Sequence, residues 1–310
     1  MIVLPYLSDH DPARSRRDLR AIIEMLIRLA TVRPAPSTAG GERQSPGRMD
    51  RVLVELVSPP FYDLLMDGKT PIDTSFDMRT DARGHDPDSH SATLRRYHQL
   101  LWSKTLPTGE TFELDAKLHH NSDLGEFWLA SDSIVHTYTR WARPTRLVRV
   151  IHELPPEETT AFYDLACTVG AYLVFPPQVR VDGHWRPSIN QRRGIHHQIR
   201  DRFDLTLECI RRHYICATSP LSEVFAPYAN FFGLFGDFSG YVDYFLLNDL
   251  VADGATAVRF FKEFDDFAGD PLPAGSVAEY RQYMKRSMNF IHARNGRIAR
   301  YATAMLRGTI

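Results

Sequence analysis

The stretch SINQRRGIHHQIRDRFDLTLECIRRHY, residues Ser188–Tyr214, lies where strand-rich sequence gives way to helix-rich sequence. Apolar residues recur at helical spacing in its second half, and this periodicity predicts a helix over Ile199–Tyr214. One arc of that helix is apolar and is expected to contact the core, through Phe203, Leu207, Ile210 and Tyr214. Charged residues gather on another arc, where i,i+4 pairing predicts a solvated, salt-bridged face: Arg200, Asp201, Asp204, Glu208, Arg211 and Arg212.

Arg202 falls at the edge of the apolar arc, in one stripe with Thr206, Cys209 and His213. A guanidinium in this position needs a carboxylate, backbone carbonyls or a bound anion, because burying it unpaired is very costly. Two interpretations therefore stay open. Arg202 either forms an internal ion pair with an acidic residue of the chain, or it faces a bound anion.

The residues just before the predicted helix form a loop rich in arginine, glycine and histidine. A helix N-terminus offers backbone N–H groups to a phosphate, arginine adds charge-assisted hydrogen bonds, and glycine permits a close approach. The loop therefore predicts a phosphate site for a nucleotide or a nucleic-acid end, built from Asn190, Arg193, Gly194 and His196 with Arg202. It matches neither a P-loop nor a dinucleotide fingerprint, and an exposed basic loop is the alternative.

A second polar segment, residues 119–136, collects side chains suited to proton transfer. His119, His120 and Glu126 are its candidate catalytic acids and bases, because a histidine and a glutamate in one cleft can exchange protons with a substrate. A strand here places Glu126 and Trp128 on the same face. No metal-ligand spacing of the HxH or HExxH kind is present, so we expect no metal site, and the sequence identifies no cofactor.

Residues 70–180 mix strand and helix patterns, whereas the rest of the chain is mainly helical. Aromatic and β-branched runs bounded by turn residues predict strands at Phe112–Leu118, Gly125–Ala130, Leu147–His152 and Gly170–Pro176. Helical spacing and proline placement predict helices at Ser91–Trp102 and Pro155–Cys167. The expected fold class is α+β, with a small mixed or antiparallel sheet packed against a mainly helical C-terminal half.

The C-terminal half carries further helix signals. Ser219, followed by proline, predicts a helix start. The aromatic-rich run Val224–Leu250 predicts two helices broken near Gly236–Gly240. Ser276 and Glu279 match a capping box, so a last helix is expected to begin at Ser276.

The N-terminal segment has a different organisation. Ser15–Arg33 has the spacing of a short amphipathic helix, and residues 32–48, rich in proline, glycine and serine, predict a flexible linker. We place a boundary near Thr70, which gives a helical appendage over 1–69 and a main α+β domain over 70–310. The amphipathic helix is a candidate docking arm for a protein partner or for a second copy of the chain.

Composition narrows the function classes. Hydrophobic residues make up 43% of the chain and charged residues 24%, which is typical of a globular protein and argues against disorder. The formal net charge of -1 gives no global signal for nucleic acid or for an anionic membrane. The apolar runs are too short to span a bilayer, and the first residues do not match a secretory signal. The three cysteines have no CxxC spacing, so we expect reduced thiols and a cytoplasmic location.

Several sequence blocks between about Ile72 and Ile298 together resemble a family. They include DTSFDMRTD, TLRRYHQLLWSK, LGEFWLASDSI, DRFDLTLECIRRHY, YANFFGLFGDFSGYVDYFLLNDLV and MNFIHARNGRI. In these blocks the chain is similar to a widespread bacterial family of unknown function. The resemblance implies a domain boundary but no activity and no catalytic residue, so the site candidates rest on charge placement alone.

Three functions follow as expectations. The first is the binding of a phosphorylated ligand in a cleft between the Arg193 loop and the 119–136 segment, by an enzyme or by a sensor. The alternative is a non-catalytic interaction protein, for example a partner in a defence or toxin–antitoxin pair, that docks through its N-terminal helix. A metal-dependent nuclease would need clustered carboxylates, and Asp201, Asp204 and Glu208 are the only obvious set. Their predicted solvated face argues against this third function.

Overall fold

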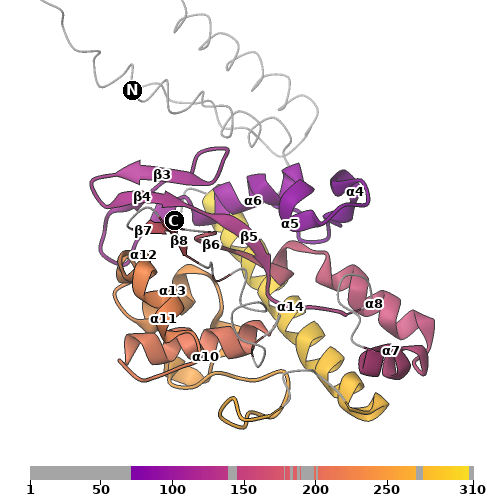
Figure 1. The fold of residues 1–310 in the computed structure, drawn as a ribbon. Helices are drawn as coiled ribbons and strands as arrows, with labels where there is room; N and C mark the ends of the chain where they lie inside the picture. The colour runs from indigo at the N-terminus through magenta and orange to yellow at the C-terminus, as the bar shows by residue number, and fades with distance from the viewer. Residues whose placement is uncertain are drawn as a thin grey trace, which may run out of the picture. The chain divides into compact units, whose positions relative to one another are not determined.

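A computed structural model of the chain describes residues 71–138, 145–177, 179–181, 184–186, 189, 199, 202–269 and 275–306 (Figure 1). The chain divides into two compact units, one of residues 72–302 and the other of residues 1–71 with 303–310. The predicted helix Ser15–Arg33, its linker and the boundary near Thr70 lie outside the described residues. The division into an appendage and a main domain therefore stays a prediction.

Within the described residues, the helices α4 (Arg79–Ala82), α5 (Pro87–His90) and α6 (Ala92–Trp102) come before the first strand. The helices α7 (Thr145–His152) and α8 (Pro156–Ala166) come later in the chain. α6 begins where the sequence predicts, because the Ser91 hydroxyl accepts a hydrogen bond from the Leu94 amide at 3.0 Å and so caps the helix. α8 also confirms its prediction, with proline in its first turn and Glu157 and Glu158 near the positive end of the helix dipole.

The strands form antiparallel pairs. Among the described residues, β1 (Lys104–Thr105) pairs with β2 (Thr111–Phe112), β3 (His119–Ser122) with β4 (Gly125–Trp128), β5 (Ala130–Ser133) with β6 (Tyr172–Phe175), and β7 (Val179–Val181) with β8 (His184–Arg186). The α+β class and the antiparallel pairing are confirmed. The single small sheet of the prediction is replaced, in the part of the chain described, by these separate two-stranded ladders.

One extended segment, residues 125–133, belongs to two of the ladders (Figure 1). Its first half, β4, pairs with β3, and its second half, β5, pairs with β6. The change of partner occurs at the buried Leu129, whose amide donates to the Leu118 carbonyl at 2.9 Å. The segment therefore joins the exposed β3–β4 hairpin to the core strand β6, all four residues of which are buried.

Two predicted strands differ from the structure. Leu147–His152 lies in the helix α7, because the buried Leu147 and Val150 and the partly buried Ile151 follow helical spacing and so share one helical face. The strand prediction rested on the β-branched residues of this segment, whose preference for strands is only a local propensity. The predicted strand Phe112–Leu118 keeps only its first residue in β2, and its last residue has a left-handed φ of 60°, which turns the chain.

The C-terminal half is helical, as predicted. Its α-helices within the described residues are α10 (Phe203–Tyr214), α11 (Ser222–Phe225), α12 (Ala229–Gly233), α13 (Phe238–Tyr244) and α14 (Val277–Leu306). Short 3-10 turns occur at η1 (Val169–Ala171), η3 (Ala226–Tyr228), η4 (Asn248–Leu250) and η5 (Asp253–Ala255). α10 begins at Phe203 instead of Ile199, so its N-terminus lies later in the chain than predicted.

The helix boundaries test the capping predictions. The break between α12 and α13 is confirmed: Gly236 has a φ of 75°, and the Asp237 carboxylate accepts from the Gly240 amide at 2.7 Å. The start of α14 is confirmed as well, since the Ser276 hydroxyl accepts from the Glu279 amide at 3.3 Å. The predicted cap at Ser219 is wrong, because α11 begins only at Ser222.

α14 runs diagonally across the middle of Figure 1 and carries a buried arginine. The Arg294 guanidinium donates to the carbonyls of Gly170 at 2.8 Å, Tyr172 at 2.6 Å, Phe245 at 3.0 Å and Leu246 at 3.3 Å. These carbonyls come from the start of β6 and from the end of α13. Arg294 therefore ties three parts of the core together through backbone acceptors.

The next residue of α14 fixes the same segment from a second side. Asn295 accepts from the Gly170 amide at 2.8 Å and donates to the Thr168 hydroxyl at 2.8 Å. A Cβ at position 170 would lie 2.5 Å from the Asn295 Oδ1 atom and 2.9 Å from the Ile291 carbonyl oxygen. Glycine is therefore required here so that α14 can approach the backbone before β6.

Candidate functional site

The β3–β4 hairpin places some of the predicted acid–base residues on one exposed face. The His119 ring stacks on Trp128 with centroids 3.9 Å apart, and its Nε2 atom lies 3.3 Å from the Glu126 Oε1 atom. Trp128 donates from its indole nitrogen to the same Glu126 oxygen at 3.0 Å, and its side chain is 46% exposed. His119, Glu126 and Trp128 thus form a surface cluster, and the shared face of Glu126 and Trp128 is confirmed.

His120 points to the opposite face of the hairpin and is buried. Its Nε2 atom lies 2.6 Å from the Ser122 hydroxyl, and its Nδ1 atom lies 2.7 Å from the Glu113 carbonyl oxygen. The ring also stacks on Phe112 with centroids 4.2 Å apart. The structure therefore brings His119 and Glu126 together but separates His120 from them, and the contacts of His120 favour a structural role.

Arg202 forms the internal ion pair that was one of the two interpretations. Its side chain is 2% exposed, and its Nε atom donates to the Asp204 carboxylate at 2.7 Å. Burial lowers the pKa of a guanidinium, but the charge and hydrogen bonds of Asp204 outweigh this effect and raise the pKa of Arg202. The Asp204 carboxylate also accepts from the Phe261 amide at 2.9 Å.

The predicted solvated face of α10 is wrong at its centre, because Asp204 and Glu208 are buried. The chain after residue 258 covers this face through the Asp204–Phe261 bond and through Asp266, which pairs with Arg212. Glu208 accepts from Arg212 at 2.9 Å, so the predicted i,i+4 pair is present. A helical wheel cannot show that a later loop covers a charged face.

The other predicted phosphate-binding residues lie outside the described residues: Asn190, Arg193, Gly194 and His196. Asp201, one of the three carboxylates considered for a metal-dependent nuclease, lies outside them as well. The phosphate site and the role of Arg202 in it stay predictions. α10 begins at Phe203, so the helix N-terminus comes four positions later in the sequence than the prediction used.

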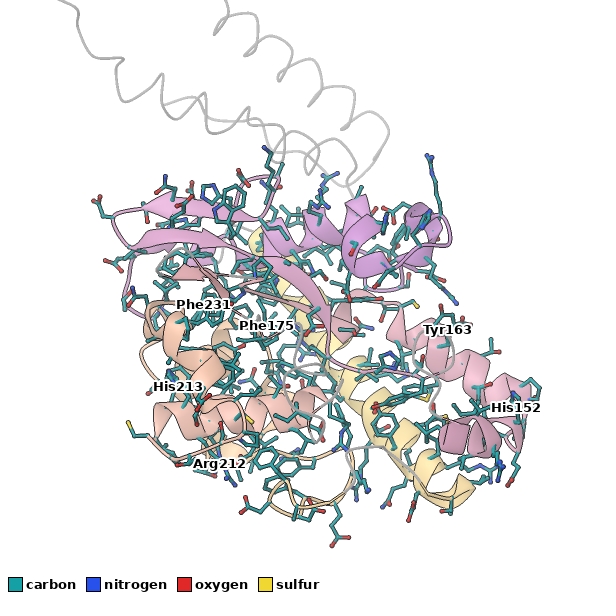
Figure 2. The ribbon with its side chains drawn as sticks, viewed as in Figure 1. His152, Tyr163, Phe175, Arg212, His213 and Phe231 are labelled. Atoms are coloured by element: carbon teal, nitrogen blue, oxygen red, sulfur yellow. The ribbon has the colours of Figure 1, made fainter. Side chains whose placement is uncertain are left out.

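A small pocket of about 50 Å³ lies between α5, the ends of β5 and β6, and α8. The polar and aromatic side chains that line it are Asp86, Asp88, Ser133, His136, Thr137, Tyr163, Cys167 and Tyr172. Asp86 caps α5 by accepting from the Asp88 amide at 3.2 Å, which holds both carboxylates at one end of a short helix. Tyr163 projects from α8 on the other side (Figure 2).

The pocket is electronegative. Burial raises the pKa of the Cys167 thiol to about 12, and burial with nearby acidic groups raises the pKa of the Tyr172 phenol well above its usual value. Both groups therefore stay protonated and neutral at physiological pH. Neither lysine nor arginine is among the described residues that line the pocket, so Asp86 and Asp88 dominate its charge.

A hydrogen-bond chain runs from the core to this pocket. The Trp102 indole donates to His98 Nδ1 at 3.1 Å, His98 Nε2 lies 3.0 Å from the Ser131 hydroxyl, and that hydroxyl donates to Asp88 at 2.8 Å. An indole nitrogen can only donate, so the neutral His98 ring carries its proton on Nε2 and donates it to Ser131. The chain therefore orients the Ser131 hydroxyl toward the Asp88 carboxylate.

His98 makes the fold sensitive to acid. Complete burial, with the Arg294 charge as a second cause, lowers the pKa of His98 to about 3. A depressed histidine pKa stabilises the fold above the unfolded value of about 6.5, and this stability is lost as the pH falls toward 3. We expect the His98 contribution to the free energy of unfolding to fall by about 2 kcal/mol between pH 7 and pH 5.

Urea denaturation at these two pH values measures that loss. His98→Gln should show a pH dependence weaker than wild type by this amount, whereas His292→Gln, at an exposed position of α14, should keep the wild-type dependence. An unchanged dependence in His98→Gln would contradict a neutral, buried His98.

Sequence reasoning missed the pocket and the hydrogen-bond chain. The i,i+4 spacing of His98 and Trp102 in α6 was visible as helical periodicity, but it gave no sign that the two side chains bond to each other. Asp88 and Ser131 are 43 positions apart, and no local pattern connects them. Only the fold brings them together.

Among the described residues, no group of three or more histidine, cysteine, aspartate or glutamate side chains is arranged to hold a metal ion. None of their helices is both long enough and apolar enough to cross a membrane.

Comparison with known proteins identifies the family of this chain. No curated protein and no solved structure matches the chain. A family model matches residues 72–298, which include every described residue of the pocket and of the hydrogen-bond chain. The match covers most of the sequence and begins close to the domain boundary predicted near Thr70. On this match the chain belongs to DUF6994, a family of unknown function.

Proposed function

We propose that the pocket between α5, β5, β6 and α8 binds a small organic cation that carries an amine. The observation behind this proposal is the convergence of two carboxylates, Asp86 and Asp88, with the aromatic side chains Tyr163 and Tyr172 on one pocket. Carboxylates offer charge-assisted hydrogen bonds to an ammonium group, and aromatic faces attract cations through their quadrupole.

The surroundings support a cation over an anion. The Arg79 guanidinium on α4 is already bonded to Asp77 and Asp164, and it lies over one face of the Tyr163 ring at 4.5 Å. This arrangement holds the Tyr163 ring in place without contributing an unpaired positive charge to the pocket. A bound ammonium would offset the repulsion between Asp86 and Asp88, which lie two residues apart.

The hydrogen-bond chain gives Asp88 a defined orientation. The Ser131 hydroxyl donates to one oxygen of Asp88, so the carboxylate is held in place before any ligand arrives. Preorganisation of this kind reduces the entropy lost on binding. Asp88 is therefore the residue whose substitution should affect the ligand most.

Binding can be tested by thermal shift and calorimetry with a panel of amines, for example spermidine and agmatine. Ligand at a hundred times its dissociation constant adds about 2.7 kcal/mol to the stability of the folded state. Asp88→Asn should weaken binding by about 10- to 100-fold, because it removes one charged hydrogen bond worth about 1.5–3 kcal/mol. Asp123→Asn, an exposed carboxylate on the β3–β4 turn, is the matched control and should bind like wild type.

Adding nucleotides to this panel separates the amine site from the phosphate site and from the interaction protein that the sequence predicts. Stabilisation by nucleotides, lost in Arg193→Ala but not in Asp88→Asn, would replace the amine site with the predicted phosphate site. If no small molecule of either class stabilises the protein, the non-catalytic interaction protein becomes the better hypothesis, and a search for a protein partner follows.

A further inference from the structure

The exposed face of the β3–β4 hairpin presents a fixed aromatic ring to solvent. Among the large apolar side chains of the described residues that are exposed, Trp128 is the only aromatic one. His119 covers one face of its indole, with ring planes 20° apart. The indole nitrogen donates to Glu126 at 3.0 Å, so the ring is held from one face and from its polar edge. In the described part of the chain no other ring packs against the indole, and its second face is open to solvent.

Polar groups flank this open ring face. Trp128 pairs with His119 across the ladder, and Glu126 pairs with Asn121, so the four side chains share one face of the hairpin. The Glu126 atom Oε1 takes both the Trp128 bond and the His119 contact. The other carboxylate oxygen, Oε2, accepts no hydrogen bond from any described residue, and the Glu126 side chain is 60% exposed. A donor group that stacks on the indole therefore finds a carboxylate oxygen still available beside it.

The charge of the surrounding segment favours a cationic ligand. Residues 106–130 contain five exposed carboxylates and one lysine, which gives this segment a charge of -4 with neutral histidines, although the whole chain has a charge of only -1. A surface of this sign repels phosphate backbones and anionic membranes and attracts positively charged groups. The five carboxylates belong to Glu110, Glu113, Asp115, Asp123 and Glu126.

We propose that the exposed face of the β3–β4 hairpin is a docking surface for a basic partner protein, which places an arginine side chain on Trp128. A guanidinium is planar and charged, so it can stack on the open indole face while it donates to the Oε2 atom of Glu126. Tryptophan is also enriched among the residues that contribute most to protein–protein binding. None of the four side chains on this face lines the pocket between α5 and α8, so the docking surface is separate from the amine site.

The test is calorimetric titration of the full-length protein with short peptides at low ionic strength. The probe peptide alternates glycine with arginine. Two matched peptides replace every arginine with lysine, which keeps the charge, or with citrulline, which keeps the planar shape without the charge. We expect the arginine peptide to bind, the lysine peptide to bind about 3-fold more weakly because an ammonium does not stack as a plane, and the citrulline peptide not to bind.

Substitutions in the protein locate the site. Trp128→Ala should weaken binding of the arginine peptide by about 10-fold, because it removes the stacking surface. Glu126→Gln should weaken it by about 3-fold, since the amide oxygen can still accept the indole N–H but carries no charge. Glu110→Gln removes another exposed carboxylate, from the turn between β1 and β2, and should change the affinity by less than about 1.5-fold.

Wild-type protein that binds none of these peptides would overturn the proposal. Equal binding of the arginine and citrulline peptides would overturn it as well, as would a folded Trp128→Ala variant that binds like wild type. A loss in Glu110→Gln as large as that in Glu126→Gln would also overturn it, because general charge attraction would then account for the binding. The citrulline peptide and Glu126→Gln keep the test conclusive if Trp128→Ala does not fold.

Discussion

Replacing Asp204 with alanine is expected to lower the free energy of unfolding by about 3–5 kcal/mol. Asp204 is fully buried, and it is the carboxylate partner of the equally buried Arg202 guanidinium. The substitution would leave that positive charge in the core without its carboxylate and would also remove the acceptor of the Phe261 amide. Urea denaturation followed by tryptophan fluorescence measures the loss.

Two variants control this experiment. Glu223→Ala removes an exposed carboxylate from α11 and should change the stability by less than about 0.5 kcal/mol. The double substitution Arg202→Met with Asp204→Leu removes both charges and should recover much of the loss, because an apolar pair carries no desolvation cost. If Asp204→Ala were as mild as Glu223→Ala, the ion pair would not be a buried one.

Replacing Arg294 with methionine is expected to destabilise the protein by about 4 kcal/mol. Methionine preserves much of the side-chain volume, so the loss reports on hydrogen bonding more than on packing. The substitution deprives the carbonyls of Gly170, Tyr172, Phe245 and Leu246 of a donor inside the core. A buried acceptor left unsatisfied costs about 1–3 kcal/mol, and relaxation of the core recovers part of the sum.

Arg300→Met is the matched control, since Arg300 lies on the same helix but is exposed. It should leave the midpoint of urea denaturation almost unchanged. Removing the Arg294 charge also relieves its repulsion of a protonated Lys104, so part of the destabilisation is offset. A loss equal to that of Arg300→Met would show that water or other donors satisfy these carbonyls.

Local sequence signals predicted the helices and their ends better than they predicted the strands. Ser91 and Ser276, where helices were predicted to begin, cap them through bonds to amides three residues later, so each signal is complete within a short window. The segment Leu147–His152 was misassigned because its β-branched residues favour strands, while its burial follows helical spacing. Packing against the rest of the core decided between the two.

The ladder partners could not be predicted from the sequence. β5 pairs with β6 across a separation of about forty residues, and the sequence between them contains helices. The first ladder ends and the second begins at Leu129, and leucine is not a turn-forming residue that would mark this change of partner. The alternation of apolar and polar residues therefore predicted an extended segment, but it could not predict which two strands pair with it.

In the candidate site, too, local features could be predicted from the sequence and long-range contacts could not. Sequence placed Glu126 and Trp128 on one face correctly, because alternation along a strand is local. It assigned Asp204 to solvent because a helical wheel contains no information about the later chain that covers it. The pocket side chains Asp88, Ser133 and Tyr163 come from three separate elements, and their convergence depends on the whole fold.

The bonds made by α14 bear on the order in which the protein acquires its structure during synthesis. Tyr283, Arg294 and Asn295 bond to backbone groups of residues 136–172, which lie 122 to 147 positions earlier in the chain. A ribosome adds roughly 5–20 residues per second, so those earlier groups wait about 6 to 30 seconds for their partners. Until α14 emerges, the β5–β6 ladder is exposed without its main polar support. The growing chain therefore depends on its last long helix to complete a core that was begun much earlier.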